Sequence, residues 1–400
     1  MGSGGREHAL AWKLSQSPSL EQLHAAPGNP GIAALGACHP VRGEDPEGLL
    51  GLCREHDVDL VVVGPEVPLV AGVADPLRHA GIAVFGPGRD AARIEGSKSF
   101  AKEVMEAAGV PTARTLAVAR PPCVVKLDGL AAGKGVFVCR TSDEVDAAVR
   151  AAAVDGGPLL IEELLEGDEL SLFALCDGRD AVALAPARDF KRVGDGDTGP
   201  NTGGMGSYSP VPEIGAAEVD ELLDTVHRPV LGELARRGRP FIGLLYAGLM
   251  LTDDGPRVLE FNCRFGDPET QSILPRLEGD LLGALASAAA GGLEGEIAAG
   301  ETAAVTVVLA APDYPAAGDS GTVIEGVADA EAAGALVFHA GTALHGGQLV
   351  TNGGRILDVT AVADDVASAR RAAYAAVDAI SFDGMRYRTD IGPKAEHVRS

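Results

Sequence analysis

The chain has 400 residues, of which 46% are hydrophobic and 4% aromatic, and a formal net charge of −24. This length predicts two to four domains, and many glycines with few aromatic residues favour small-residue α/β packing over a β-sandwich. So acidic a chain is not expected to bind nucleic acid through a basic surface. Any phosphate site must therefore be a local concentration of lysine, arginine and backbone N–H groups.

The six cysteines form no CxxC pair and no His/Cys spacing typical of a metal site. Most of them lie in apolar runs, which is typical of small core residues in a reducing cytosol. The chain has no signal-peptide pattern, and its apolar runs are far shorter than the roughly 18–20 residues that span a bilayer. We expect a cytoplasmic protein that binds no membrane.

The first predicted domain, residues 1–92, opens on the glycine-rich loop MGSGGREHAL, which resembles a phosphate cradle at the start of a helix. Such a cradle normally follows a buried strand, and here only Met1 stands before the glycine loop. Residues 59–70 and 81–88 predict two buried parallel strands, each closed by Gly-Pro, with a crossover helix between them. We expect an open parallel-sheet α/β domain without its first strand, in which no sheet hydrogen bonds fix the start of the loop.

The second predicted domain spans residues 93–295. Its predicted elements are a helix from Ser97 to the break at Gly109–Pro111, a strand in 123–129, a glycine-rich turn and strand in 129–139, a helix in 141–153, acidic residues around a buried strand in 159–175, and two strands in 244–270. Residues 191–210 are dense in glycine and polar side chains, which predicts either a long functional loop or a disordered tract. Residues 300–400 predict a small α/β domain with short strands and one alanine-rich helix.

Two lysines and two glutamates in the second domain indicate a nucleotide site. Lys126 ends the apolar strand CVVK, and Lys134 lies in the glycine turn GLAAGKG, where backbone N–H groups can approach phosphate closely. The turn is not a Walker A motif, because Gly135 follows the lysine where Ser or Thr is required. Glu162 and Glu169 follow, and they are placed to face an adenine and to receive ribose hydroxyls. Each alone is typical of a solvated surface, but the four in this order resemble the ATP-grasp superfamily, which holds ATP between two antiparallel sheets.

The stretch LEFNCRFGDPET carries the strongest chemical signal. Glu260, Asn262 and Arg264 alternate with apolar residues on a predicted strand, so all three point to one face. A carboxylate and an amide oxygen are hard ligands that suit Mg²⁺ bridging phosphates, and the arginine can stabilise an acyl phosphate or a transferring phosphoryl group. The preceding strand, LLYAGLML, contributes no acid.

A longer resemblance runs through nearly the whole chain. The segments that carry it are, in order, GSGGREHALAWK, APGNPG, VVGPEVPLVAGVAD, EGSKSFAKEVM, DGLAAGKGV, KRVGDGDTGPNTGGMGSYSP, GLLYAGLM, EFNCRFGDPETQ, FHAGT and VTNGGRIL. They resemble the phosphoribosylamine–glycine ligase family, also called glycinamide ribonucleotide synthetases. The resemblance implies that ATP phosphorylates glycine to glycyl phosphate, which the amine of 5-phosphoribosylamine then attacks, in the second step of purine biosynthesis. It also implies small-molecule substrates only, and we expect a monomer.

The resemblance also implies roles for individual residues. Those expected to hold ATP are Lys98, Lys126, Lys134, Glu162 and Glu169, with Lys134 and Arg264 acting in catalysis. Those expected to bind Mg²⁺ or Mn²⁺ are Glu260 and Asn262. Those expected to hold phosphoribosylamine or the other substrate groups are Gly4, Gly5, Arg6, Glu7, Pro27, Gly28, Asn29, Asp195, Asn201 and Asp267. Thr198 and residues 203–206 would complete a loop over the site, because acyl phosphates hydrolyse in water.

Besides the missing strand, the sequence departs from the family pattern in two places, and other functions compete with the leading one. The span 111–124 is short where family members usually fit a helix, and Arg188 and Phe190 stand where the family more often has Gln and His.

A different ATP-grasp ligase or carboxylase would share the Lys/Glu/Asn set but not REHALAW or the 191–210 segment. A Rossmann oxidoreductase fits poorly, because Glu7 occupies the third glycine position of GxGxxG. A non-catalytic nucleotide-binding module would not need the set of Glu260, Asn262 and Arg264.

Overall fold

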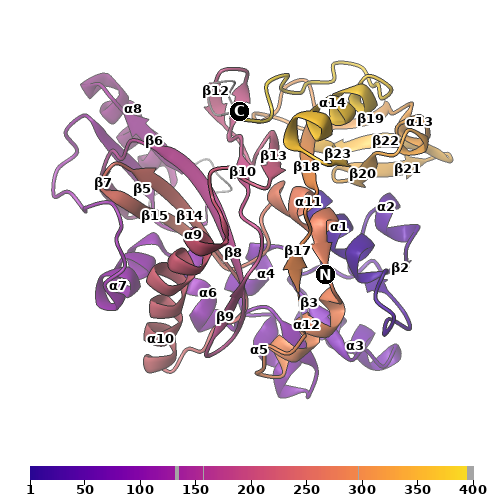
Figure 1. The fold of residues 1–400 in the computed structure, drawn as a ribbon, viewed down its shortest axis with the longest axis horizontal. Helices are drawn as coiled ribbons and strands as arrows, with labels where there is room; N and C mark the ends of the chain where they lie inside the picture. Colours follow the sequence, from indigo (N-terminus) through magenta and orange to yellow (C-terminus); the bar gives the residue numbers. More distant parts are fainter. Residues whose placement is uncertain (131–134, 156, 296, 394–400) are drawn as a thin grey trace.

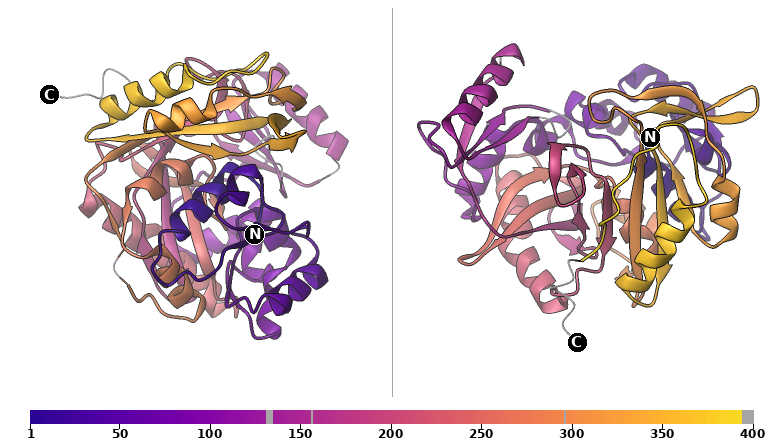
Figure 2. Two further views of the ribbon diagram at one scale, coloured as in Figure 1. Left: turned by 90° about the vertical axis from the view of Figure 1, so that its right-hand side faces the viewer. Right: turned by 90° about the horizontal axis from the view of Figure 1, so that it is seen from above.

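The computed structural model describes residues 1–130, 135–155, 157–295 and 297–393. A central antiparallel sheet lies between an N-terminal group of parallel strands and a smaller sheet that carries α8, and a further sheet near the C-terminus lies beside it (Figures 1 and 2). Within these ranges no helix has the length and apolar character needed to cross a bilayer. The mixture of helices and strands is the α/β architecture that the sequence predicts.

The N-terminal group contains two pairs of parallel strands, β1 with β2 and β3 with β4. Its elements are α1 (Gly5–Leu14), β1 (His24–Ala25), α2 (Pro30–Ala33), β2 (Ala37–Cys38), α3 (Pro46–Glu55), β3 (Leu60–Val62), α4 (Glu66–Ala71), α5 (Ala74–His79) and β4 (Ala83–Phe85). The strands predicted in 59–70 and 81–88 are present as β3 and β4, but the second half of the first run is not strand, because it forms α4. The predicted crossover helix is present as α5, and it is separated from α4 where Gly72 adopts a φ of +88°.

The first two residues of the chain bridge the two strand pairs. The amino group of Met1 donates to the carbonyl of Val62 over 2.8 Å. Gly2 donates to the carbonyl of Ala26 over 2.8 Å and accepts from the N–H of Gly28 over 3.0 Å. The prediction that no sheet hydrogen bonds fix the start of the glycine loop is therefore wrong, because two residues suffice to reach both neighbours.

The central sheet is antiparallel in the order β15–β14–β8–β9. Its strands and the helices around it are α6 (Arg89–Gly96), α7 (Lys98–Ala108), β8 (Asp168–Asp177), β9 (Ala181–Ala183), α9 (Ala216–Leu222), α10 (Arg228–Arg236), β14 (Ile242–Thr252), β15 (Gly255–Asn262), α11 (Glu269–Ile273) and α12 (Leu281–Ala289). Both faces are buried. On β8, Leu170 and Leu172 belong to the cluster that contains α7 and α10, whereas Phe173 and Leu175 belong to the cluster that contains α1 and α12.

The smaller sheet has the order β6–β5–β7 and is also antiparallel. It consists of β5 (Cys123–Leu127), β6 (Val136–Cys139) and β7 (Leu159–Glu163), with α8 (Ser142–Asp155) packed against it. The two antiparallel sheets of the predicted ATP-grasp architecture are thus present. Residues 111–122 form no helix; they run along β7, where the N–H of Leu116 donates to the carbonyl of Ile161 over 2.8 Å.

Residues 188–209 connect the central region to the C-terminal sheet. Their elements are β10 (Arg188–Asp189), β11 (Arg192–Gly194), β12 (Thr198–Asn201) and β13 (Gly206–Ser209). The β11 and β12 strands form a hairpin, while β10 and β13 join the sheet β10–β13–β18–β23–β20. The alternative that residues 191–210 are a disordered tract is wrong, because β11 pairs with β12 and β13 pairs with β18 of the C-terminal sheet.

The C-terminal region contains the predicted short strands and alanine-rich helix, and a second small sheet, β19–β22–β21. Its elements are β18 (Ala303–Ala310), β19 (Asp319–Val323), α13 (Val327–Ala332), β20 (Leu336–His339), β21 (Thr342–His345), β22 (Gln348–Gly353), β23 (Arg355–Ala363) and α14 (Val366–Val377). Two further short strands, β16 (Leu277–Glu278) and β17 (Ala298–Ala299), pair with each other near its start.

Candidate active site

A cleft of about 640 Å³ is lined by residues from both antiparallel sheets, from α6 and α7, and from the segment β10–β12. Its lining is unusually rich in charged and amide side chains. They include Arg6, Glu66, Glu95, Lys98, Lys102, Lys126, Glu162, Glu169, Arg188, Asp189, Lys191, Asn201, Glu260, Asn262, Arg264, Asp267, Glu269 and Arg355. The chain has a net charge of −24, so a phosphate site requires a local concentration of basic groups, and this cleft contains one.

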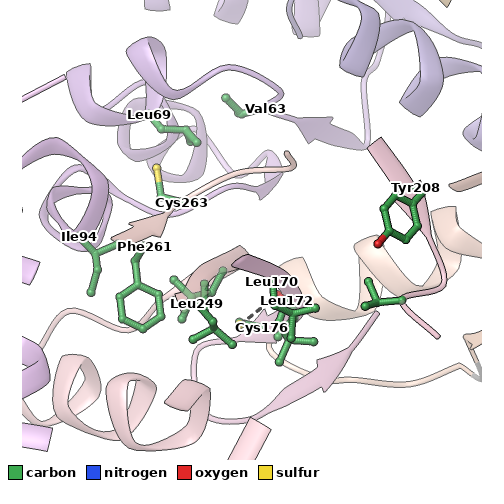
Figure 3. Packing of buried hydrophobic residues seen from close by; sticks show 14 of the residues in the cluster. Val63, Leu69, Ile94, Leu170, Leu172, Cys176, Tyr208, Leu249, Phe261 and Cys263 are labelled. Carbon is green, nitrogen blue, oxygen red and sulfur yellow. Dashed lines mark hydrogen bonds between the residues drawn. The ribbon is translucent and has the colours of Figure 1, made fainter. Parts of the chain in front are cut away.

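The end of β15 presents its polar residues to this cleft. Glu260, Asn262 and Arg264 line it, while the side chains of Phe261 and Cys263 belong to the apolar cluster that also contains Ile94 and Leu69 (Figure 3). Burial alone would raise the pKa of Glu260, but Lys191, Lys126 and Lys98 outweigh it and hold the pKa below its usual range. The carboxylate is therefore anionic at neutral pH.

Arg264 is held by two carboxylates. Its Nε lies 3.2 Å from Glu66 Oε2 and its Nη2 lies 3.1 Å from Glu95 Oε1, and Nη2 also donates to Asn262 Oδ1 over 3.2 Å. Burial opposes the charge on the guanidinium, but Glu95 and Glu66 outweigh it and raise the pKa of Arg264. The cation is thus permanent and its direction is fixed.

A buried ion cluster forms where β5, β7 and α7 meet. The side chain of Glu162 is 3% exposed, and its two oxygens lie 2.6 Å from the ammonium groups of Lys102 and Lys126. Lys126 also donates to the carbonyl of Leu259 on β15 over 2.9 Å. These contacts fix the position of the Lys126 ammonium at the edge of the cleft.

Further charged groups line the same cleft. Lys191 donates to Glu169 over 2.8 Å. Burial raises the pKa of the adjacent Asp189 to about 8 against the opposing effect of Lys191. Lys98, the first residue of α7, donates from its side chain to the carbonyl of Gly129 over 2.9 Å, and burial lowers its pKa although Glu260 opposes this.

The opening glycine loop lies beside the cleft, and Arg6 reaches into it. Arg6 donates to Glu7 over 2.6 Å and to the carbonyl of Phe265 over 3.0 Å. The N–H of Gly4 donates to Glu7 Oε2 over 2.6 Å, which closes the start of α1. A Cβ at Gly5 would overlap the carboxylate of Asp358, so this position requires glycine.

Asn29 is buried behind the loop rather than in the cleft. Its Nδ2 donates to the carbonyls of Ser3 over 2.9 Å and His339 over 2.6 Å, and its Oδ1 accepts from the N–H of Ile32 over 2.9 Å. It joins the glycine loop, α2 and β20. Neither Pro27 nor Gly28 lines the cleft as the structure describes it.

The β11–β12 hairpin contributes Asn201 to the cleft but directs Asp195 away from it. Asp195 accepts from the N–H of Thr389 over 2.8 Å, near the end of the described chain. Asp267 lines the cleft and pairs with Arg355 over 2.8 Å.

The structure accommodates the two residues that depart from the family pattern. Arg188 pairs with Glu213 over 2.7 Å, and the ring of Phe190 lies 4.8 Å from the guanidinium carbon of Arg388.

Three family models match the chain in succession. They are described as the N domain, the ATP-grasp (A) domain and the C domain of phosphoribosylglycinamide synthetase, and they match residues 1–95, 96–270 and 304–394. The chain belongs to the phosphoribosylglycinamide synthetase family.

Individual proteins agree with this assignment. A phosphoribosylamine–glycine ligase of Streptomyces coelicolor is 51% identical over 412 residues, covering 99% of this chain and 98% of the relative. The crystal structure of a phosphoribosylamine–glycine ligase from Thermotoga maritima superposes with a TM-score of 0.81 at 36% identity and 98% coverage of both chains. The biotin carboxylase domain of the Hydrogenobacter thermophilus 2-oxoglutarate carboxylase shares the fold, with a TM-score of 0.71 at 16% identity over 96% of this chain and 90% of that one.

Within this member of the synthetase family, the structure brings most of the predicted residues to one cleft. Those that line it are Arg6, Lys98, Lys126, Glu162, Glu169, Asn201, Glu260, Asn262, Arg264 and Asp267. Lys134 lies outside the described residues. Sequence reasoning missed several charged lining groups, among them Glu66, Glu95, Lys102, Asp189, Lys191, Glu269 and Arg355. Lys102 could have been found from the sequence, because it lies four residues after Lys98 on a predicted helix and so lies on the same face of that helix.

Proposed function

We propose that the chain ligates glycine to 5-phosphoribosylamine with consumption of ATP, through glycyl phosphate, giving glycinamide ribonucleotide, ADP and phosphate. The observation that carries the proposal is the row of Glu260, Asn262 and Arg264 facing the lysines of one cleft. Membership of the synthetase family over the whole chain supplies the choice of substrates. The ligase is expected to act in the cytoplasm as a monomer.

In the proposed site, ATP lies between the two antiparallel sheets. Lys98 and Lys126 neutralise phosphate oxygens, with Lys134 added by resemblance, and Glu169 accepts from the ribose. Glu162 acts through Lys126: both of its oxygens are already used by ammonium groups, so it positions the lysine. This differs from the direct contact with the nucleotide that the sequence predicts for Glu162.

The donor set on β15 fits a divalent cation, Mg²⁺ or Mn²⁺. Glu260 is anionic at neutral pH, and Asn262 offers an amide oxygen on the same face; oxygen ligands of this kind suit hard cations. When bound, the metal neutralises charge on the phosphate oxygens. Glu260 and Asn262 would hold it, and phosphates and water would complete its shell.

The remaining chemistry is positioning and electrostatic stabilisation, because the reaction needs no covalent nucleophile on the protein. The fixed cation of Arg264 stabilises the negative charge that develops as glycine carboxylate attacks and as phosphate leaves. Arg6 and the start of α1 hold the phosphate of phosphoribosylamine. The β11–β12 hairpin excludes water from glycyl phosphate.

A coupled assay of ADP release tests the proposal. We expect ADP release only when glycine and phosphoribosylamine are both present, and Asn262→Ala should raise the Mg²⁺ concentration needed for half-maximal rate. Asn352→Ala, an exposed asparagine on β22, is the matched control. Turnover with bicarbonate in place of glycine would instead support a carboxylase, and nucleotide binding without turnover would support a non-catalytic module.

A further inference from the structure

Three histidines that are far apart in the sequence meet on one side of the N-terminal group. His24 lies on β1, His39 directly follows β2, and His56 caps the end of α3. Each offers a ring nitrogen, and these three nitrogens lie within 4.8 Å of one another. Among the residues that the structure describes, no other group of three His, Cys, Asp or Glu side chains meets this spacing.

The rings are packed together rather than spread over the surface. The centroids of His24 and His56 are 4.5 Å apart in a stacked arrangement, and those of His39 and His56 are 4.8 Å apart. All three side chains are half-buried.

Gln22 determines which nitrogen of His24 carries the lone pair. Its amide oxygen lies 3.2 Å from His24 Nε2, and because that oxygen can only accept, Nε2 carries the proton. Nδ1 therefore presents its lone pair toward His39 Nε2, 3.0 Å away. Metal-binding histidines typically donate their other ring N–H to an oxygen in this way, which fixes the tautomer.

We propose that His24, His39 and His56 form a binding site for Zn²⁺. Zn²⁺–nitrogen bonds of about 2.0–2.1 Å in tetrahedral geometry place the nitrogens roughly 3.3 Å apart, close to the separation of His24 Nδ1 and His39 Nε2. Without the cation, His39 Nε2–H donates to His24 Nδ1. On binding, His39 carries its proton on Nδ1 instead, which leaves the lone pair of Nε2 for the cation.

The site would tie together three segments next to the substrate loop. β1 leads directly into Ala26, whose carbonyl accepts from the N–H of Gly2, and into Pro27, which forms a parallel bridge with Gly2 at the start of the glycine loop. A cation that joins β1, β2 and α3 would thus stabilise the framework behind that loop. It would be a structural site, separate from the Glu260 and Asn262 pair, whose oxygen ligands suit Mg²⁺.

The test is calorimetric titration of the full chain, without a histidine tag, with ZnCl₂ in millimolar Mg²⁺, which occupies the oxygen-ligand site. We expect one equivalent of Zn²⁺ to bind, and His39→Ala or the better-packed His39→Gln to weaken binding at least tenfold. Gln22→Ala should weaken it about tenfold by releasing the tautomer of His24. His345→Ala, an exposed histidine on β21, is the matched control and should leave binding unchanged.

Co²⁺ provides a second readout, since tetrahedral coordination by three imidazoles gives visible absorption bands that the His39 variants should lose. The proposal is overturned if the wild-type chain takes up no Zn²⁺ in this titration, or if the His39 variants bind as tightly as it does. It is also overturned if Cys38→Ser, which removes the neighbouring exposed thiol, abolishes binding while His39→Ala does not.

Discussion

Glu162 is the carboxylate that the cleft's lysines hold most closely. Its oxygens lie 2.6 Å from Lys102 and Lys126, and its side chain is 3% exposed. Removing the charge from one partner of a buried ion cluster leaves the others uncompensated, at a cost of about 3–5 kcal/mol. We therefore expect Glu162→Gln to lower the free energy of unfolding by about 3 kcal/mol and to raise the KM for ATP, measured by urea unfolding and by ATP titration of the coupled assay.

The adjacent residue provides the control. Glu163 pairs with Arg114, whose side chain is 75% exposed. Exposed ion pairs contribute about 0–1 kcal/mol, so Glu163→Gln should change the free energy of unfolding little. Equal losses in the two variants would show that the buried cluster has no special role.

Asp358 gives the protein a pH-dependent stability. Burial, together with Asp267, raises its pKa to about 7 from a usual 3.8, although Arg355 opposes this. The folded state therefore binds more protons than the unfolded state between these values, so the stability that Asp358 contributes is greatest below pH 3.8 and is lost as the pH rises to about 7. Asp358→Asn, which imitates the protonated acid, should flatten the pH dependence of the free energy of unfolding by up to about 1.4 kcal/mol per pH unit.

The measurement is urea unfolding at a series of pH values from 4 to 8. Asp329→Asn, on the exposed side of α13, should retain the wild-type slope. If the Asp358→Asn profile parallels that of the wild type, the carboxyl group is ionised in the folded protein throughout this range.

Individual site residues differ in how far the sequence could reveal them. Glu260, Asn262 and Arg264 were predictable because strand alternation alone places them on one face. Glu95 and Glu66 were not, because they lie far before β15 in the sequence and meet Arg264 only through tertiary packing. The sequence also could not reveal the cluster of His24, His39 and His56, because these residues have no regular spacing that indicates a shared ligand.

At the scale of elements, the β11–β12 hairpin is held by the last described segment of the chain. Arg388, with a side chain that is 1% exposed, pairs with Asp197 of the hairpin over 2.8 Å and with Asp390 over 2.7 Å. Its guanidinium also lies over Phe190. The arginine thereby connects the hairpin to the C-terminal segment.

We expect Arg388→Ala to loosen the hairpin and let water reach glycyl phosphate. ADP would then be released without ligation, so the ratio of ADP to glycinamide ribonucleotide should rise above one. Quantifying both products in the same reaction measures this ratio. Arg371→Ala, an exposed arginine on α14, should keep the ratio at one, and an unchanged ratio in Arg388→Ala would exclude the hairpin as a barrier to water.

Elements with strong local signals were predicted well, and those that depend on distant partners were not. α7 begins at the Ser97 cap and ends at Gly109 as the sequence indicates. Residues 191–210 looked structureless because their partners lie elsewhere: β13 pairs with β18, about a hundred residues further along. The two-residue bridge formed by Met1 and Gly2 is likewise too short to produce a pattern.

At the scale of the whole molecule, the regions that match separate family models share their packing. β10 and β13 complete the C-terminal sheet. The N-terminal region contacts the same sheet, because His8 Nδ1 accepts from the N–H of His339 on β20 over 2.8 Å. The ring of Trp12 on α1 also lies 5.9 Å from that of Phe338. These contacts make independent unfolding of one region costly.

We therefore expect one cooperative unfolding transition. The chain has a single tryptophan, so fluorescence reports the interface of Trp12 with Phe338, while far-UV circular dichroism reports all secondary structure; the two urea transitions should coincide. Trp12→Phe should remove the fluorescence change and leave the circular dichroism transition in place. A chain cut after Ala299 should show no cooperative transition, because β13 loses its partner strand and the buried residues around it are exposed to water. A shift of Trp12 emission at lower urea than the loss of secondary structure would show instead that the N-terminal and C-terminal regions separate before either unfolds.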